Sequence, residues 1–279
     1  MIKSFFLNPV LGKEFKLRFR SLKTLFGIIF YLASIGLMIL AFIYMSTRGG
    51  ASYNFSSHQS REMFMVLSFL QLGLILFVTP GLTAGVISSE RERQTLNILL
   101  TTTQSSTSII VSKLLSSICF LLLMVVASMP LYSFVFLYGG VAPEHLLYVL
   151  GMYILMMISF GALGVMFSTI IRRTIISMVV TYSVGLFLVA GTGFLFIFTQ
   201  EFFYYMQQPN QGTNVFPYIF GMLNPVIMMM NIFEPMETDY LVRRTGIAFP
   251  MWISFVISYG VITILSILVS IRKLRPKMK

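Results

Sequence analysis

Long, nearly charge-free apolar runs divide the chain into six segments of membrane-spanning length. They lie approximately at 25–45, 63–87, 114–138, 146–171, 175–199 and 249–271. Each run reaches the roughly 20 apolar residues that an α-helix needs to cross a bilayer. Isolated strands would leave their backbone groups unpaired in lipid, so these runs are predicted to be helices. The pattern predicts an all-α integral membrane protein with six transmembrane helices.

Composition supports the bilayer as the solvent of this chain. Hydrophobic residues make up 57% of the 279 residues and charged residues only 10%, whereas soluble domains carry about 25% charged residues. The six spans leave no stretch that could bury a separate soluble core. We therefore expect one transmembrane domain over 1–279, and we expect the late, long first apolar run not to be a cleaved signal peptide.

The distribution of charge between the loops predicts how the chain is oriented. If the N-terminus lies inside the cell, the inner segments hold 16 of the 20 Lys and Arg residues and three of the nine acids. The outer segments then hold four basic residues and six acids. This is the positive-inside asymmetry of membrane proteins. It predicts that both termini are cytoplasmic, and it explains the net charge of +11 without nucleic acid as a partner.

One apolar segment is too irregular to be counted as a span. The outer loop 200–248 contains the apolar stretch 216–233, which is interrupted by Pro217, Asn224, Pro225 and Asn231. A seventh span here would also place the basic C-terminal tail outside. We expect short half-helices, broken at Asn224–Pro225, that dip into the outer leaflet or lie at its surface. Their irregular backbone needs protein or water to satisfy it.

The segment that precedes the first span is amphipathic. In residues 1–24, apolar side chains recur every three to four positions from Leu11 to Leu22, with Lys and Arg mostly between them. This spacing favours a helix that lies in the inner membrane interface, among anionic lipid headgroups. The alternative is a basic flank that only sets the topology.

The inner segment 88–104, between the second and third spans, is the only substantial inner loop. Ser89 followed by Glu92 fits a capping box, so a helix is predicted to begin there. Leu96, Leu99 and Leu100 would give it a short apolar face, and the polar run 101–108 should end it. Two interpretations stay open from these residues alone: a surface helix that receives a push from a soluble partner, or a solvated loop.

Catalytic and metal-binding patterns are missing from the sequence. His58 and His145 have no partner at metal-ligand spacing, and the single cysteine, Cys119, allows no cysteine-based site. There is no Gly-x-x-x-x-Gly-Lys-Ser/Thr phosphate loop. No predicted span carries a deeply placed charge, which disfavours an ion-coupled carrier. We expect no enzyme activity, no metal and no cofactor in this chain.

The inner loop resembles a known family. The stretch 87–102, Ile-Ser-Ser-Glu-Arg-Glu-Arg-Gln-Thr-Leu-Asn-Ile-Leu-Leu-Thr-Thr, is similar to the coupling-helix motif of permease subunits of type-two ATP-binding-cassette (ABC) transporters. The opening Asn-Pro-Val-Leu-Gly-Lys-Glu-Phe at 8–15 resembles that family's N-terminal amphipathic helix. Two residues depart from the family pattern. Gln94 stands where glycine is common, and Gln104 or a neighbour stands where proline is common; both changes predict a more continuous helix.

The resemblance implies half of an exporter. Two six-span permeases, identical or paralogous, would pair around a pathway, and each would sit on a separate cytoplasmic ABC ATPase that holds ATP and Mg. The coupling helix would dock into a groove of that ATPase. Carried over by position, the coupling residues are Glu90, Arg91, Glu92, Arg93, Thr95, Leu96 and Leu99. The charged residues would make charge-assisted contacts, and Leu96 and Leu99 would be buried against the ATPase.

Two competing functions are a secondary transporter or channel without an ATPase, and a membrane scaffold that transports nothing. The inner loop favours the permease over both. The expected location is the plasma membrane, in contact with lipid, and the resemblance suggests a bacterial cell.

Overall fold

The structure is a computed structural model of the 279-residue chain. It describes residues 22–48, 57–96, 105–137, 139, 142–206, 215–235, 245, 247 and 249–274. The N-terminal amphipathic helix predicted at 1–24 lies outside the described residues, except for its last three residues, which begin the first long helix.

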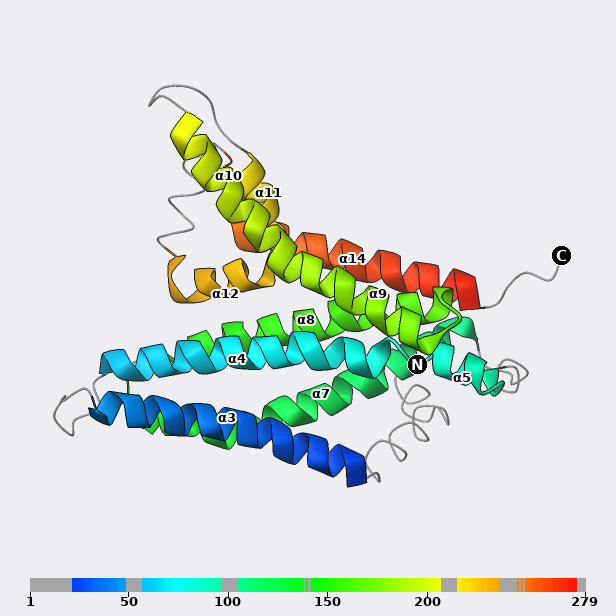
Figure 1. Ribbon diagram of the computed structural model, residues 1–279, viewed down its shortest axis with the longest axis horizontal. Coiled ribbons are helices and arrows are strands. Elements are labelled where there is room, and N and C mark those ends of the chain that lie inside the picture. Colours follow the sequence, from blue (N-terminus) through cyan, green and yellow to red (C-terminus); the bar gives the residue numbers. More distant parts are fainter. Residues whose placement is uncertain are drawn as a thin grey trace.

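Six long apolar segments form helices, and no strand occurs in the described ranges (Figure 1). They are α3 (Leu22–Arg48), α4 (Ser57–Thr83), α7 (Ser106–Leu137), α8 (Pro143–Ile170), the composite α9 (Thr174–Leu186), η1 (Phe187–Gly191) and α10 (Thr192–Met206), and α14 (Met251–Leu274). Six segments are long and apolar enough to cross a membrane. The predicted all-α membrane fold with six candidate spans is confirmed.

Several helices are longer than the apolar runs that predicted them. Helix α4 starts at Ser57 and helix α7 starts at Ser106, because polar residues extend each helix before its apolar run. Side-chain hydroxyls inside the spans donate to carbonyls one turn earlier, as Thr79 Oγ1 does to the Ile75 carbonyl at 2.6 Å. Serine and threonine are thereby accommodated in an apolar helix without exposing an unpaired polar group.

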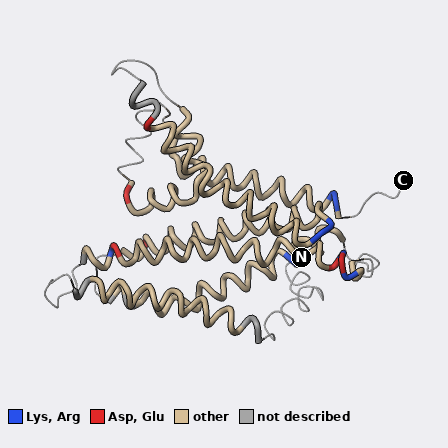
Figure 2. Tube along the Cα trace, viewed as in Figure 1, with Lys and Arg blue, Asp and Glu red and all other residues tan. Residues whose placement is uncertain are grey.

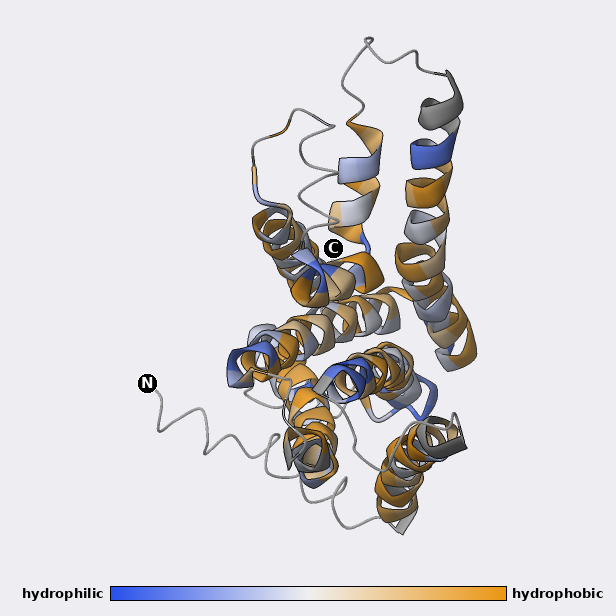
Figure 3. Cartoon of the chain, turned by 90° about the vertical axis from the view of Figure 1, so that its left-hand side faces the viewer, coloured by the Kyte–Doolittle hydropathy of each residue, from blue (hydrophilic) through white to orange (hydrophobic). Residues whose placement is uncertain are grey.

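The core of the bundle is made by α4, α7 and α8, and α14 packs along α8 (Figure 1). The buried share is 50% to 67% for the spans of α4, α7 and α8, and 17% for the spans of α3 and α9–α10. Figure 3 shows apolar residues on most visible sides of the long helices, as expected when lipid is the solvent. At the crossing of α8 and α4, a Cβ on Gly164 would lie 3.2 Å from the Ala84 nitrogen.

The irregular segment forms two short helices that bend sharply. The first is α11 (Phe216–Leu223) and the second is α12 (Pro225–Phe233), separated by Asn224. The angle between them is 92°. The break therefore falls at Asn224–Pro225, as the sequence predicts. If the bent pair were one span, the count of candidate spans would be seven.

Charge is separated between the two ends of the bundle (Figure 2). One end, called the basic end below, carries α5 (Ser88–Glu92), the connection between α8 and α9, and the last turn of α14. Its exposed cations are Arg93, Arg172, Arg173, Arg272 and Lys273. The opposite end carries Glu62, Glu144, Glu201 and Glu234, together with Arg61. The fold therefore brings loops far apart in sequence into one positively charged end.

Candidate functional site

The inner loop continues the second span through one turn into α5. The Ser89 nitrogen donates to the Gly85 carbonyl at 3.0 Å, and the Arg91 nitrogen donates to the Ile87 carbonyl at 3.0 Å. The predicted surface helix is thus a short extension of α4. Backbone hydrogen bonds therefore make α5 continuous with the end of the second span.

The start of α5 is stabilised by another helix, not by its own capping box. Ser168 Oγ of α8 accepts hydrogen bonds from the Ile87 nitrogen at 2.8 Å and the Ser88 nitrogen at 3.0 Å. Ser89 lies inside α5, and the helix has no side-chain cap of its own. The prediction that Ser89 caps the helix is wrong, because the α4 chain is still helical where the capping box expects an extended residue.

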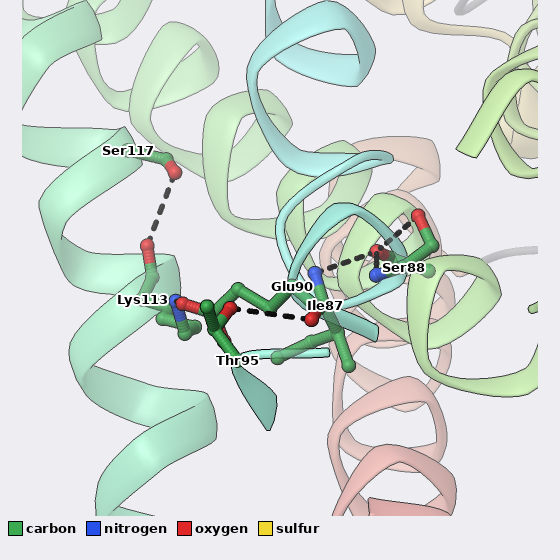
Figure 4. A network of polar contacts seen from close by, with 7 residues as sticks. Ile87, Ser88, Glu90, Thr95, Lys113 and Ser117 are labelled. Atoms are coloured by element: carbon green, nitrogen blue, oxygen red, sulfur yellow. Dashed lines mark hydrogen bonds and ion pairs between the residues drawn. The ribbon is translucent and has the colours of Figure 1, made fainter. Parts of the chain in front are cut away.

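An ion pair ties α5 to the third span. Glu90 Oε1 lies 2.7 Å from Lys113 Nζ, and the Lys113 side chain is only 2% exposed (Figure 4). Lys113 lies inside α7, two turns after its start at Ser106. A buried lysine needs a charged or strongly polar partner, because desolvation of an unpaired ammonium group is costly. Glu90 is therefore directed into this chain.

The next two residues of α5 contact the ends of two neighbouring helices. Arg91 Nη2 donates to the Thr169 carbonyl, at the end of α8, at 3.1 Å. Glu92 accepts from the Thr174 nitrogen at 2.8 Å and from Thr174 Oγ1 at 2.7 Å, at the start of α9. A cation at a helix C-terminus and an anion at a helix N-terminus both complement the helix dipole. The pair therefore ties α5 to the fourth and fifth spans.

Gln94 ends α5 in a left-handed conformation. Its φ is 58°, the Thr95 nitrogen donates to the Glu90 carbonyl at 3.0 Å, and the Gln94 nitrogen donates to the Arg91 carbonyl at 3.1 Å. These are the two hydrogen bonds of a Schellman motif, in which glycine is the usual residue at this position. The expected more continuous helix is wrong, since the chain turns here although the glycine is replaced.

Leu96 anchors the segment inside this chain. Its side chain is 5% exposed and packs in a cluster with Ile87, Ile109, Ile110, Leu114 and Leu274. In this structure the Leu96 side chain is covered by α7 and α14, and its contact with an ATPase stays a prediction. Leu99, the other expected apolar contact, lies outside the described residues. Thr95 is exposed, and its hydroxyl donates to the Glu90 carbonyl at 3.2 Å.

The fold brings residues to α5 that the sequence alone did not assign to the site. Burial and then the charge of Arg172 lower the pKa of the Arg91 guanidinium. Hydrogen bonds from Thr174 and then the charge of Arg173 lower the pKa of the Glu92 carboxyl group. Ser168, Thr174 and Lys113 supply the hydrogen bonds described above. Only Lys113 had a usable signal, because it is the single charged residue between positions 105 and 137. The others lie in a different loop, which only the fold places beside α5.

In the described part of the chain, no group of three or more His, Cys, Asp or Glu residues could hold a metal ion. The sequence of residues 9–275 matches the family described as ABC-2 family transporter protein. No curated protein matches the chain. The family match covers nearly the whole chain and agrees with the six candidate spans and the inner-loop motif. The chain therefore belongs to the ABC-2 transporter family, as a membrane permease subunit.

Proposed function

We propose that this permease is one half of an ABC exporter and that α5 receives the movement of a separate cytoplasmic ATPase. One observation carries the proposal. Five residues in and next to α5 bind α7, α8 and α9, namely Ile87, Ser88, Glu90, Arg91 and Glu92. Helix α5 itself continues α4. A force applied to α5 therefore reaches four spans at once.

The charged residues of α5 divide into two groups. Glu90, Arg91 and Glu92 bind partners within this chain, so in the proposed complex they transmit movement. Arg93 is exposed, and Arg172 and Arg173 are exposed beside α5. We assign these three arginines to the ATPase contact, where carboxylates of the partner would form charge-assisted hydrogen bonds with them. Thr95 remains a proposed contact at the edge of this surface, and Leu99, which lies outside the described residues, remains a proposed contact.

The orientation follows from the same surface. The basic end would face the cytoplasm by the positive-inside rule, which places both termini there and the bent pair α11–α12 in the outer half. A second permease, identical or paralogous, would complete the pathway in the plasma membrane of a bacterium. ATP and Mg would be held by the ATPase, and this chain would carry no cofactor.

Reversal of the arginines tests the contact. We expect the double variant Arg93→Glu, Arg172→Glu to lose co-purification with the ATPase in detergent, because two attractive contacts become repulsive. The matched control is Arg272→Glu, Lys273→Glu, which reverses two exposed charges at the same end on α14. Unchanged association of the first variant would contradict the proposed surface. Equal loss in both variants would attribute the binding to net charge alone.

A second variant tests transmission separately from binding. Thr174→Val removes the hydroxyl that donates to Glu92 and leaves the exposed arginines in place. We expect normal co-purification but weaker stimulation of ATP hydrolysis by the reconstituted permease. Ser183→Val is the matched control, because the Ser183 hydroxyl bonds only to the Val179 carbonyl of its own helix, at 2.8 Å. Full stimulation in Thr174→Val would show that the Glu92 contact does not transmit movement.

A further inference from the structure

The fifth span contains a π-helical turn near its middle. The turn η1 covers Phe187–Gly191, between α9 and α10. Val189 lies roughly 20 Å along the helix from either end of the span at Thr174 and Glu201. A π turn inserts an extra residue into the helix, and such turns are frequent at functional sites. Here the Thr192 nitrogen donates to the Phe187 and Val189 carbonyls, and each carbonyl has a second acceptor site that a further donor can use.

Asn224 supplies that donor from the break between α11 and α12. Its side chain is 1% exposed, and Nδ2 donates to the Val189 carbonyl at 2.7 Å and to Thr192 Oγ1 at 2.9 Å. Its Oδ1 accepts from the Val226 nitrogen at 2.8 Å and the Ile227 nitrogen at 3.1 Å, which caps α12. Both amide hydrogens and both acceptor sites of the side chain are used. One residue thus satisfies the broken pair and the π turn together.

The two helices joined at Asn224 pack on different parts of the molecule. Helix α11 packs against α10 and α14 (Figure 1), and the Tyr218 hydroxyl lies 2.6 Å from Ser254 Oγ of α14. Helix α12 packs on the core, where Arg61 Nη2 of α4 donates to the Phe233 carbonyl at 2.6 Å. The rings of Phe64 and Phe233 are 5.6 Å apart. Asn224 therefore lies at the joint between a helix on the core and a helix held by α10 and α14.

We propose that Asn224 is a positioning residue for transport, which pins the middle of the fifth span, and with it α10, to α12 on the core. In this proposal the pathway opens at the end opposite α5 when the Asn224 amide leaves Val189 and α10 swings with α11 about the π turn. Bonds between neutral groups are weaker than charge-assisted ones, so this joint opens more easily than the ties around α5. The proposal rests on the proposed function as an ATP-driven permease with a separate ATPase, and not on which residues around α5 contact that ATPase.

Gly193 leaves room for the side-chain amide of Asn224 beside the fifth span. A Cβ at this position would lie 3.0 Å from Asn224 Nδ2, so a larger residue would displace the amide. This gives a perturbation that does not alter Asn224 itself. Serine at position 224 gives another, because serine is a good helix cap but its shorter side chain does not reach Val189.

The test is a distance measurement on the full complex with its ATPase in lipid nanodiscs. In a Cys119→Ser background, spin labels are attached at Phe198→Cys of α10 and Met230→Cys of α12, both exposed positions. The parent should show a short distance without nucleotide and a longer one with ATP and vanadate. Asn224→Ser should populate that longer distance without nucleotide, by roughly threefold, the factor for losing one average hydrogen bond in a membrane.

Thr199→Val is the matched control, because the Thr199 hydroxyl bonds only to carbonyls of its own helix, Leu195 and Phe196. It should behave as the parent. If Asn224→Ser yields no folded complex, Gly193→Val takes its place under the same criterion. A parental distance in the folded variant without nucleotide would overturn the proposal. A parent whose distance does not change with ATP and vanadate would overturn it as well.

Discussion

At the scale of single residues, Gln94 shows where the chain departs from the conformation that its sequence favours. A left-handed conformation costs a residue other than glycine roughly 1–2 kcal/mol. Glycine avoids this cost but loses more conformational entropy on folding, which offsets part of the stabilisation. We expect Gln94→Gly to stabilise the protein by about 1 kcal/mol, measured as a rise in the thermal unfolding midpoint in detergent. Gln94→Ala keeps the strained conformation and should give no gain.

Gly164 is a second residue whose effect can be predicted from its surroundings. A methyl group there would meet Thr83 and the Ala84 backbone, and backbone cannot move aside cheaply. We expect Gly164→Ala to lower the free energy of unfolding by about 1–3 kcal/mol, as overpacking does. The matched control in the same helix is Gly151→Ala, where no atom lies within 4 Å of the added carbon. Gly151→Ala should be neutral or stabilising, because alanine has the higher helix propensity, and an equal loss of stability in both variants would show that the crossing is not responsible.

At the scale of elements, the tie between α5 and α7 is an ion pair with one buried partner. Lys113→Met leaves Glu90, one of whose oxygens is buried without a partner, and removal of one member of such a pair costs about 3 kcal/mol. The double variant Lys113→Met, Glu90→Leu should recover most of that loss. Chemical or thermal unfolding of the two variants checks this. A double variant as unstable as the single one would mean that Lys113 acts through its other contacts.

The sequence predicts the helical elements well because membrane spans carry a strong local signal. The six apolar runs correspond to six long helical segments, and the short helices α11 and α12 are separated at Asn224–Pro225, as expected. The boundaries were less accurate, since apolarity does not reveal that the Ser- and Thr-rich residues 106–113 are helical. The π turn was not foreseen, because Phe187–Gly191 has no residue that distinguishes it from a regular helix.

The candidate site was only partly predictable for a different reason. The charged motif at 90–93 is evident in the sequence, but the partners of its members come from other parts of the chain. Ser168 and Thr174 carry no local sign that they bind α5, and Leu96 has the same apolar character whether it faces this chain or another. Assignment of each side chain to the inside or the outside therefore required the fold.

At the scale of the whole molecule, the separation of charge predicts which surfaces are accessible from each side of the membrane. In a Cys119→Ser background, Glu234→Cys should react with an impermeant maleimide on intact cells, since position 234 lies exposed at the end opposite the basic end. Lys273→Cys, exposed at the basic end, should react only after the cells are made permeable. The opposite result would invert the proposed topology.

The uneven burial of the spans also has a consequence for synthesis. The second, third and fourth spans bury 50%, 67% and 56% of their most apolar windows, and the sixth only 28%. Because the three well-buried spans are consecutive, they can associate while the rest of the chain is still on the ribosome, which adds about 5–20 residues per second. The last helix, α14, then docks on a finished α8. A chain interrupted after the fourth span would already contain the three best-buried spans, but not the core residues of α12 and α14.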